Sequence, residues 1–215
     1  RITLDQIKRL GALHDDSRSV SLWRNASGIF LSCLLLVYFV HIFARRNIRK
    51  YRPENRDLIF LSSIFVVHIL VLKICIFISS ALGSAFPYVD QNAYYYIFPF
   101  AVGTMLVRIV LNSEISLVFA ILSAIVTGTL FGNSFAIMFF AFMTSLSGAH
   151  WVRHVTERSS LFRAGLRLGV FNFALILALH LMTSRPFDLQ LIYKLGFGFT
   201  GGLASAVIVT GTVPR

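Results

Sequence analysis

The sequence has 215 residues, of which 56% are hydrophobic and only 13% are charged, and its formal net charge is +11. Soluble domains carry about 25% charged residues, and a soluble fold of this length has too little interior to hide so much apolar surface. The composition therefore excludes a soluble globular protein and predicts an all-α, polytopic membrane protein. Lysines and arginines cluster between apolar runs, as they do in cytoplasmic loops, so the positive charge does not indicate nucleic-acid binding.

Seven segments are long and apolar enough to cross a bilayer, whose core needs about 20 mainly apolar residues per helix. Very short connections follow the third and fourth segments, so these helices should be antiparallel neighbours. The predicted domains are 1–25, the end of an extracellular domain with its linker; 26–212, the seven-helix membrane domain; and 213–215, a linker to a missing cytoplasmic domain or a remnant of a cleaved tag. The seven predicted spans are 26–44, 58–82, 93–111, 114–132, 134–152, 163–183 and 189–212.

The loops predict the orientation, because lysine and arginine concentrate in cytoplasmic loops. The segments at 44–57 (ARRNIRKYRPENRD) and 152–167 (VRHVTERSSLFRAGLR) are strongly basic. The connections at 83–92 and 131–134 contain no lysine or arginine. Alternation through seven spans places every loop consistently if the N-terminus is outside and the C-terminus is in the cytoplasm.

The third predicted span contains Pro99 and Gly103 in its outer half. Proline removes a backbone hydrogen bond and kinks a helix, and such a break persists in lipid only where a neighbouring helix or a watery cavity satisfies the freed carbonyl. The span therefore predicts a kink and indicates a cavity open to the outside, flanked by Tyr95 and the tyrosines on either side of it. A belt of interfacial tyrosines beside a simple packing kink is the alternative.

Ionisable and polar side chains inside the spans are functional candidates, because burying them in lipid is unfavourable. Lys73, His180 and Lys194 fall in the outer half and would suit a small anionic ligand that arrives from outside. The alternative is that the lysines extend to the headgroups and His180 bonds a neighbouring helix. The predicted ligand-binding set is Lys73, Tyr95, Pro99, His180 and Lys194.

A second set of residues suits signalling or packing. Arg108 and Glu114 lie at the inner end of the third and fourth spans, where an arginine can extend to headgroups and a glutamate can favour a helix N-terminus. Arg167 falls toward the inner side and Asn172 near mid-membrane. Glycines also recur at four-residue spacing, which lets helix backbones approach closely; the pairs are Gly128 and Gly132, Gly165 and Gly169, and Gly198 and Gly202.

These glycine pairs predict packing within the bundle, with a homodimer interface as the alternative. The last span, which holds Gly198 and Gly202, is especially rich in small residues. A smooth helix of this kind could slide or rotate easily, and we hypothesise that it passes a signal to the segment that follows it.

Several segments, taken in order, resemble one known family. They are T-x-x-Q-I-x-x-L-x-A-L from Thr3 to Leu13, the central pair of spans at 97–132, RSSLFRAGLRLGVFN at 158–172 and GGLASAVIVTGTVP at 201–214. Together they resemble the membrane module of the bacterial seven-transmembrane receptors with an intracellular HD hydrolase, the PgpH type, whose characterised members degrade cyclic di-AMP. The resemblance implies an inner-membrane protein with an extracellular domain and a cytoplasmic phosphodiesterase domain that holds divalent metal ions.

The sequence lacks the residues that such a hydrolase needs. Its HD motif would supply carboxylate and imidazole ligands for metal ions that activate water. The one HDD triplet, His14 to Asp16, falls in the predicted extracellular segment. We therefore expect no catalytic residue, no metal ligand and no cofactor in this chain.

The predicted function is a transmembrane sensor or anchor that couples an extracellular domain to a cytoplasmic cyclic-di-AMP phosphodiesterase. Its expected partners are membrane lipid, these two domains, a small ligand and, on the alternative above, a second copy of the chain. The main alternative function is a small-molecule uptake protein similar to the substrate-binding membrane component of a vitamin transporter. An integral-membrane enzyme is a weaker alternative, because the spans contain neither an H-E-x-x-H motif nor paired carboxylates.

Overall fold

The computed structural model describes residues 27, 28, 31, 34, 38, 42, 55–153, 158–183 and 186–213. The chain divides into two compact units, Arg1–Phe43 and Ala44–Arg215. All six described residues of the first unit are helical and fall in the predicted first span, 26–44. The rest of that span, the segment 1–25 and the end of the chain at 214–215 lie outside the described residues.

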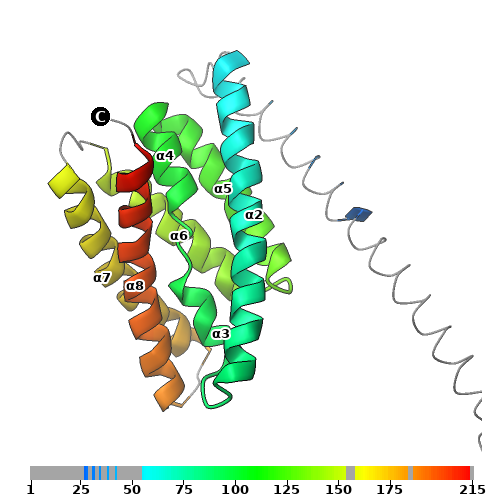
Figure 1. The fold of residues 1–215 in the computed structure, drawn as a ribbon, viewed down its shortest axis with the longest axis vertical. Coiled ribbons are helices and arrows are strands. Elements are labelled where there is room, and N and C mark those ends of the chain that lie inside the picture. Colours follow the sequence, from blue (N-terminus) through cyan, green and yellow to red (C-terminus); the bar gives the residue numbers. More distant parts are fainter. Residues whose placement is uncertain are drawn as a thin grey trace, which may run out of the picture. The chain divides into compact units, whose positions relative to one another are not determined.

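The second unit is a bundle of helices joined by short connections (Figure 1). Five segments are long and apolar enough to cross a membrane, and a sixth, α6, is a shorter apolar helix. No strand occurs in the described residues. The all-α prediction is confirmed, while the count of seven spans and the orientation stay predictions. The elements are α2 (Asn55–Ala85), α3 (Gln91–Tyr94), the 3-10 helix η1 (Tyr95–Ile97), α4 (Val102–Val110), α5 (Ser113–Leu130), α6 (Phe135–Trp151), α7 (Arg158–Met182) and α8 (Leu189–Thr212).

Short polar side chains begin α3, α5, α6 and α8 by accepting hydrogen bonds from backbone amides that have no partner in the first turn. Asn112 accepts from the Ile115 amide at 2.9 Å before α5, and Asp188 accepts from the Leu191 amide at 3.1 Å before α8. The turn between α5 and α6 instead uses positive φ angles, at Gly132 (74°) and Asn133 (57°). Gly132 therefore serves the turn, and the prediction that it packs helices together with Gly128 is wrong.

The third predicted span is fully interrupted, where the sequence predicts only a kink. Residues 98–101 separate η1 from α4, and Phe98 is extended, with a ψ of 142°. A residue before proline avoids the α conformation, and Pro99 has no amide to continue the helix. A neighbouring helix satisfies one freed carbonyl, because the Ser145 hydroxyl of α6 donates to the Phe100 oxygen at 3.2 Å. Figure 1 shows the irregular segment between α3 and α4.

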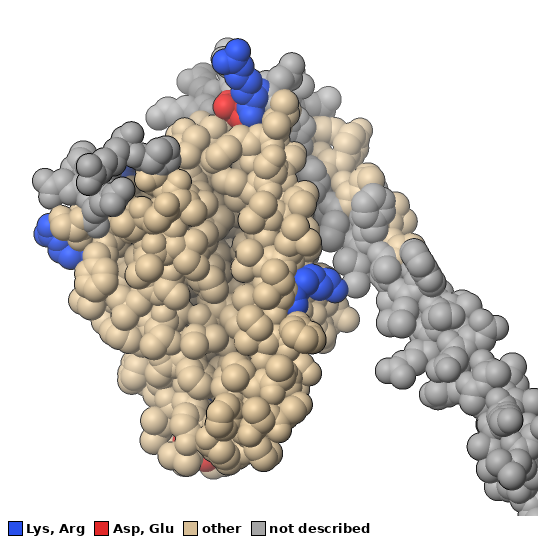
Figure 2. All heavy atoms as spheres, viewed as in Figure 1, with Lys and Arg blue, Asp and Glu red and all other residues tan. Residues whose placement is uncertain are grey.

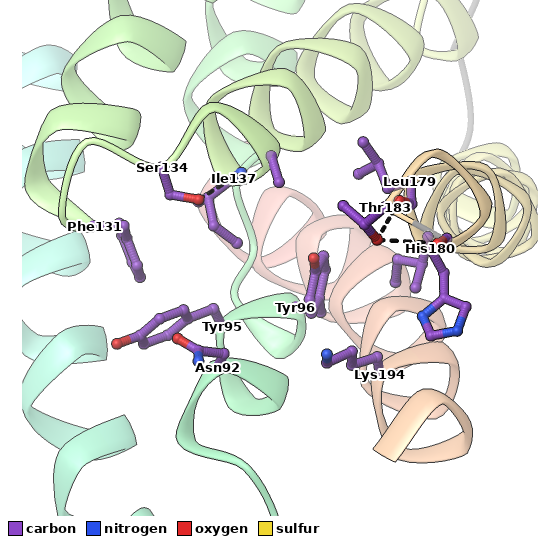
Figure 3. A pocket seen from close by; sticks show the side chains of 12 residues that line it. Asn92, Tyr95, Tyr96, Phe131, Ser134, Ile137, Leu179, His180, Thr183 and Lys194 are labelled. Carbon is purple, nitrogen blue, oxygen red and sulfur yellow. Dashed lines mark hydrogen bonds between the residues drawn. The ribbon is translucent and has the colours of Figure 1, made fainter. Parts of the chain in front are cut away.

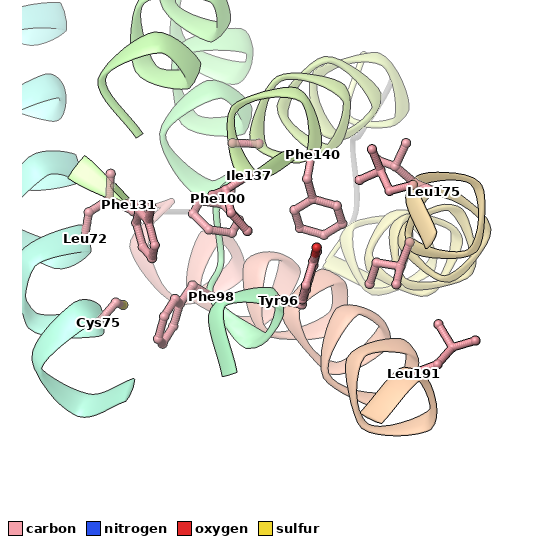
Figure 4. Packing of buried hydrophobic residues seen from close by; sticks show 13 residues of the cluster. Leu72, Cys75, Tyr96, Phe98, Phe100, Phe131, Ile137, Phe140, Leu175 and Leu191 are labelled. Carbon is pink, nitrogen blue, oxygen red and sulfur yellow. The ribbon is translucent and has the colours of Figure 1, made fainter. Parts of the chain in front are cut away.

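Aromatic side chains from both sides of this interruption fill the space around it (Figure 4). The ring of Tyr96 meets that of Phe140 edge-on, with centroids 4.9 Å apart. Phe100 lies 5.9 Å from Phe140 and 6.0 Å from Phe131, also edge to face. Such arrangements are preferred by aromatic quadrupoles. The aromatic core therefore holds the segment 98–101 together with two backbone hydrogen bonds, from the Val102 amide to the Pro99 oxygen at 3.2 Å and from the Met105 amide to the Ala101 oxygen at 2.8 Å.

Helices α7 and α8 make the most extensive contact in the unit. Small residues allow it: a Cβ added at Gly202 would lie 2.5 Å from the Gly169 amide nitrogen. One added at Gly169 would lie 2.8 Å from the Phe199 oxygen, and one added at Gly165 would overlap Ala206. The glycines at 165, 169 and 202 thus bring two backbones together within one chain.

Charged side chains gather at the ends of the unit, and the face seen in Figure 2 carries few of them between those ends. We call the end where α2 begins and α8 finishes the basic end. The opposite end, where α2 finishes and α8 begins, carries Asp90 and Asp188 in its connections. The arginines whose side chains the structure describes all lie at the basic end or in the adjoining turns of α4 and α7; they are Arg56, Arg108, Arg153, Arg163 and Arg167.

Candidate functional site

A pocket of about 240 Å³ lies near the end opposite the basic end (Figure 3). Its walls come from α3 and η1, from the turn before α6 and the start of α6, from the end of α7, and from α8. We call it the tyrosine pocket. It is lined by Asn92, Tyr95, Tyr96, Phe131, Ser134, Ala136, Ile137, Ile176, Leu179, His180, Thr183 and Lys194.

Two basic side chains face this pocket from neighbouring helices. The His180 side chain is buried, and its Nε2 lies 3.1 Å from the Pro186 carbonyl oxygen. Because a carbonyl can only accept, Nε2 carries a hydrogen and donates it. Lys194 is half-buried and has no ion-pair partner within the ranges 55–153, 158–183 and 186–213. Figure 3 shows Lys194 and Tyr96 in the space between Tyr95 and His180.

The remaining polar groups of the pocket are neutral. Asn92 is exposed at the mouth, and the Tyr95 ring meets Phe131 edge-on with centroids 4.8 Å apart. The Thr183 hydroxyl donates to backbone oxygens of its own helix, at 3.1 Å to Leu179 and 3.0 Å to His180. No acidic residue lines the pocket. Bases and neutral donors beside aromatic walls suit a small polar ligand with a negative charge.

Three of the five predicted ligand-binding residues, Tyr95, His180 and Lys194, come together in the tyrosine pocket. Pro99 does not line it and serves the interruption of the third span instead. Lys73 does not line it either, because it is exposed on α2. The residue before it, Leu72, is buried, and each helical step turns the side-chain direction by about 100°. Lys73 thus lies off the buried stripe.

Among the signalling or packing residues, Asn172 joins three helices. It is 1% exposed, its Oδ1 accepts from the Thr144 hydroxyl of α6 at 2.9 Å, and its Nδ2 donates to the Gly198 oxygen of α8 at 3.0 Å. A Cβ added at Gly198 would overlap the Ile176 side chain. Both Asn172 and Gly198 therefore lie in the contact between α7 and α8.

The three charged members of that set lie at the basic end. Arg108 is half-buried at the last turn of α4, and Glu114 is half-buried in the first turn of α5. No ion pair joins these two residues in the described part of the chain. Arg167 is exposed on α7. Neither Glu114 nor Arg167 lines a described pocket, whereas Arg108 lines a second one at this end.

Several polar residues that were not predicted from the sequence line the tyrosine pocket or join helices in the structure. Asn92, Ser134 and Thr183 line the tyrosine pocket, and each stands in or beside a predicted loop. Thr144 and Ser145, which bond Asn172 and Phe100, stand inside the predicted fifth span. The sequence could have indicated Thr144 and Ser145, because a hydroxyl within an apolar span needs a hydrogen-bond partner. Loop residues carry no comparable signal.

Comparisons with known proteins identify the family. The model of the family described as "7TM receptor with intracellular HD hydrolase" matches residues 23–215. The chain belongs to this family.

Two curated relatives of this 7TM receptor domain are both named cyclic-di-AMP phosphodiesterase PgpH. The protein of Listeria monocytogenes serotype 1/2a (strain 10403S) is 23% identical over 219 residues, which cover 100% of this chain and 29% of the relative. The protein of Bacillus subtilis (strain 168) is 21% identical over 201 residues, which cover 90% of this chain and 27% of the relative. The chain thus spans less than a third of either relative. No solved structure matches, and neither name supports the uptake-protein alternative.

Proposed function

We propose that this 7TM domain senses a small ligand and couples an extracellular domain to a cytoplasmic HD-type cyclic-di-AMP phosphodiesterase, in the bacterial inner membrane. The observation that carries the proposal is the family match over residues 23–215, since both curated relatives are phosphodiesterases of much greater length. Among the described residues, no group of three or more His, Cys, Asp or Glu side chains could hold a metal ion. We place the divalent metals that phosphodiester hydrolysis would use in the cytoplasmic domain.

The distribution of charge supports the proposed orientation. Arginines at the basic end and their scarcity at the opposite end favour a cytoplasmic basic end, by the positive-inside rule. The tyrosine pocket then opens toward the outside. A ligand that reaches it would contact Lys194 on α8, the helix that runs from this pocket to the basic end. Binding would favour whichever arrangement of the helices holds the ligand more tightly.

The orientation can be tested with a matched pair of exposed serines at opposite ends of the unit. Ser84 lies near the end of α2 and Ser113 lies at the start of α5. In a chain whose Cys33 and Cys75 are replaced by alanine, we expect a membrane-impermeant maleimide to label Ser84→Cys in intact cells. It should label Ser113→Cys only after the membrane is permeabilised. The reverse pattern would invert the topology.

The coupling can be tested without knowing the ligand, by filling the pocket. Ala136 lines the tyrosine pocket, whereas Ala81 is exposed on α2. In the proposed longer protein, Ala136→Phe should change the rate of cyclic-di-AMP hydrolysis in membranes by at least about twofold, because a two-state equilibrium shifts tenfold for every 1.4 kcal/mol of differential interaction. Ala81→Phe makes the same change on the exposed surface of α2, away from the pocket, and should leave the rate unaltered.

The measurement is the rate of cyclic-di-AMP hydrolysis by equal amounts of each variant and of the unmodified protein in membranes. If Ala136→Phe and Ala81→Phe both match the unmodified protein, the domain anchors the enzyme and does not regulate it. If both variants change the rate equally, the effect does not come from the pocket.

A further inference from the structure

The second pocket, at the basic end, has a volume of about 140 Å³ and plays no part in the proposed ligand sensing. It lies between the last turn of α4, the first turns of α5 and the end of α6. We call it the arginine pocket. It is lined by Arg108, Ser113, Ser116, Leu117, Leu146, Ala149, His150 and Arg153.

We propose that the arginine pocket binds the phosphate group of an anionic membrane lipid. Its charged lining is wholly basic, since Arg108 and Arg153 are accompanied by His150 and by no carboxylate. Among the described residues, neither arginine has an ion-pair partner, and the nearby Glu114 does not line the pocket. Two guanidinium groups that line one cavity and have no ion-pair partner among the described residues match the geometry of a phosphate, which they bind with paired hydrogen bonds.

The polar groups of α5 add to the charge. The Ile115 amide donates to the side-chain oxygen of Asn112, and the Ser116 amide donates to the backbone oxygen of Asn112 at 3.1 Å. The amide of Ser113, which lines the pocket, has no acceptor within the described residues, so it remains available beside the two arginines. Free first-turn amides favour an anion, as a supplement to the arginines.

The apolar part of the lining indicates a lipid and not a free anion. Leu117 and Leu146 line the pocket and are 39% and 37% exposed. They stand on α5 and α6, so an apolar wall leads from the phosphate position onto the side of the bundle. A ligand with an anionic head and acyl chains would use both parts. Basic pockets at the ends of membrane helices bind such headgroups.

The assignment of this lipid to the cytoplasmic leaflet rests on the proposed function and its orientation. Binding itself does not depend on the sensing function, because the tyrosine pocket shares no lining residue with the arginine pocket. A measurement of lipid binding therefore tests the arginine pocket alone, and its result does not depend on the outcome of the tyrosine-pocket experiment.

The test uses the purified 215-residue chain in neutral detergent, with binding of phosphatidylglycerol and phosphatidylcholine followed by native mass spectrometry. Arg108→Gln and Arg153→Gln should each weaken phosphatidylglycerol binding about fivefold, the loss expected for one basic residue beside an anionic headgroup. Arg163→Gln is the matched control, because Arg163 is exposed at the same end but lies outside the pocket. Phosphatidylcholine binding should stay the same in all three variants.

Two outcomes would overturn the proposal. An equal loss in the Arg163→Gln variant would assign the binding to the general charge of the basic end. Displacement of phosphatidylglycerol by millimolar inorganic phosphate would assign the pocket to a free anion. Arg153 is exposed, so its variant keeps the test valid even if replacing the half-buried Arg108 disturbs the fold.

Discussion

Replacing Gly202 with valine should prevent α7 and α8 from packing and leave little correctly folded protein. A Cβ at this position would lie 2.5 Å from the Gly169 nitrogen and 2.7 Å from its Cα. Both atoms are backbone, so no side-chain rotation can relieve the overlap and the two helices must separate. Overpacking a well-packed core costs about 1–3 kcal/mol and occasionally more, and we expect the upper end or beyond.

The matched control is Gly196→Val on the same helix, because a Cβ added at Gly196 meets nothing within 4 Å. Both variants place a β-branched residue in α8, so any difference between them reports the contact with α7. The thermal unfolding temperature and the monodisperse fraction in detergent should both fall sharply for Gly202→Val and little for Gly196→Val. Similar values for the two variants would show that the backbones do not meet at Gly202.

Replacing Asn172 with leucine should destabilise the bundle by about 1–3 kcal/mol, the usual cost of leaving a buried hydrogen-bonding group without its partner. The change removes the acceptor of the Thr144 hydroxyl and the donor to the Gly198 oxygen. All of this lies in the bundle interior, where Thr144 and Asn172 are each 1% exposed. Hydrogen bonds between membrane helices average only about 0.6 kcal/mol, which argues for the lower part of the range.

A double-mutant cycle separates the bond from other effects of the substitution. Thr144→Val keeps the shape of threonine but removes the hydroxyl. If the bond contributes, the combined variant should lose less stability than the two single variants added together. Strict additivity of the three unfolding free energies would mean that Thr144 and Asn172 do not interact.

The length and apolar composition of the runs predicted the helices well, because an apolar run of bilayer length has few other stable structures. Six of the predicted spans, the second to the seventh, coincide with observed helical segments, and the third predicted span is interrupted. Residues that interact within one helix pair were also foreseeable: Asn172 is a polar group in an apolar span, and Gly198 and Gly202 show the four-residue spacing of close helices.

The direction in which a side chain points was not foreseeable in the same way. Depth in the membrane follows from counting residues, so His180, Lys194 and Lys73 all fell in the same half. Only the packing of α2 decides that Leu72 faces the core and Lys73 does not. The extent of the interruption at Pro99 likewise depends on distant groups, since the Ser145 hydroxyl and the surrounding aromatic rings hold the extended segment in place.

The close contact of α7 and α8 limits how the domain can change shape. Gly202 meets the backbone of Gly169, and the Gly198 oxygen is bound by Asn172, so α8 cannot glide along α7 by a single residue without a collision. This argues against an independently sliding last helix. The two helices therefore form one closely packed pair, which carries His180 and Lys194, while Tyr95 and Ser134 face them from the rest of the bundle. The backbone of α8 also lies close to that of η1, because a Cβ added at Gly201 would lie 2.6 Å from the Tyr96 oxygen. A ligand in the tyrosine pocket would therefore contact both sides of this junction, and we expect its binding to favour the arrangement of helices that holds it more tightly.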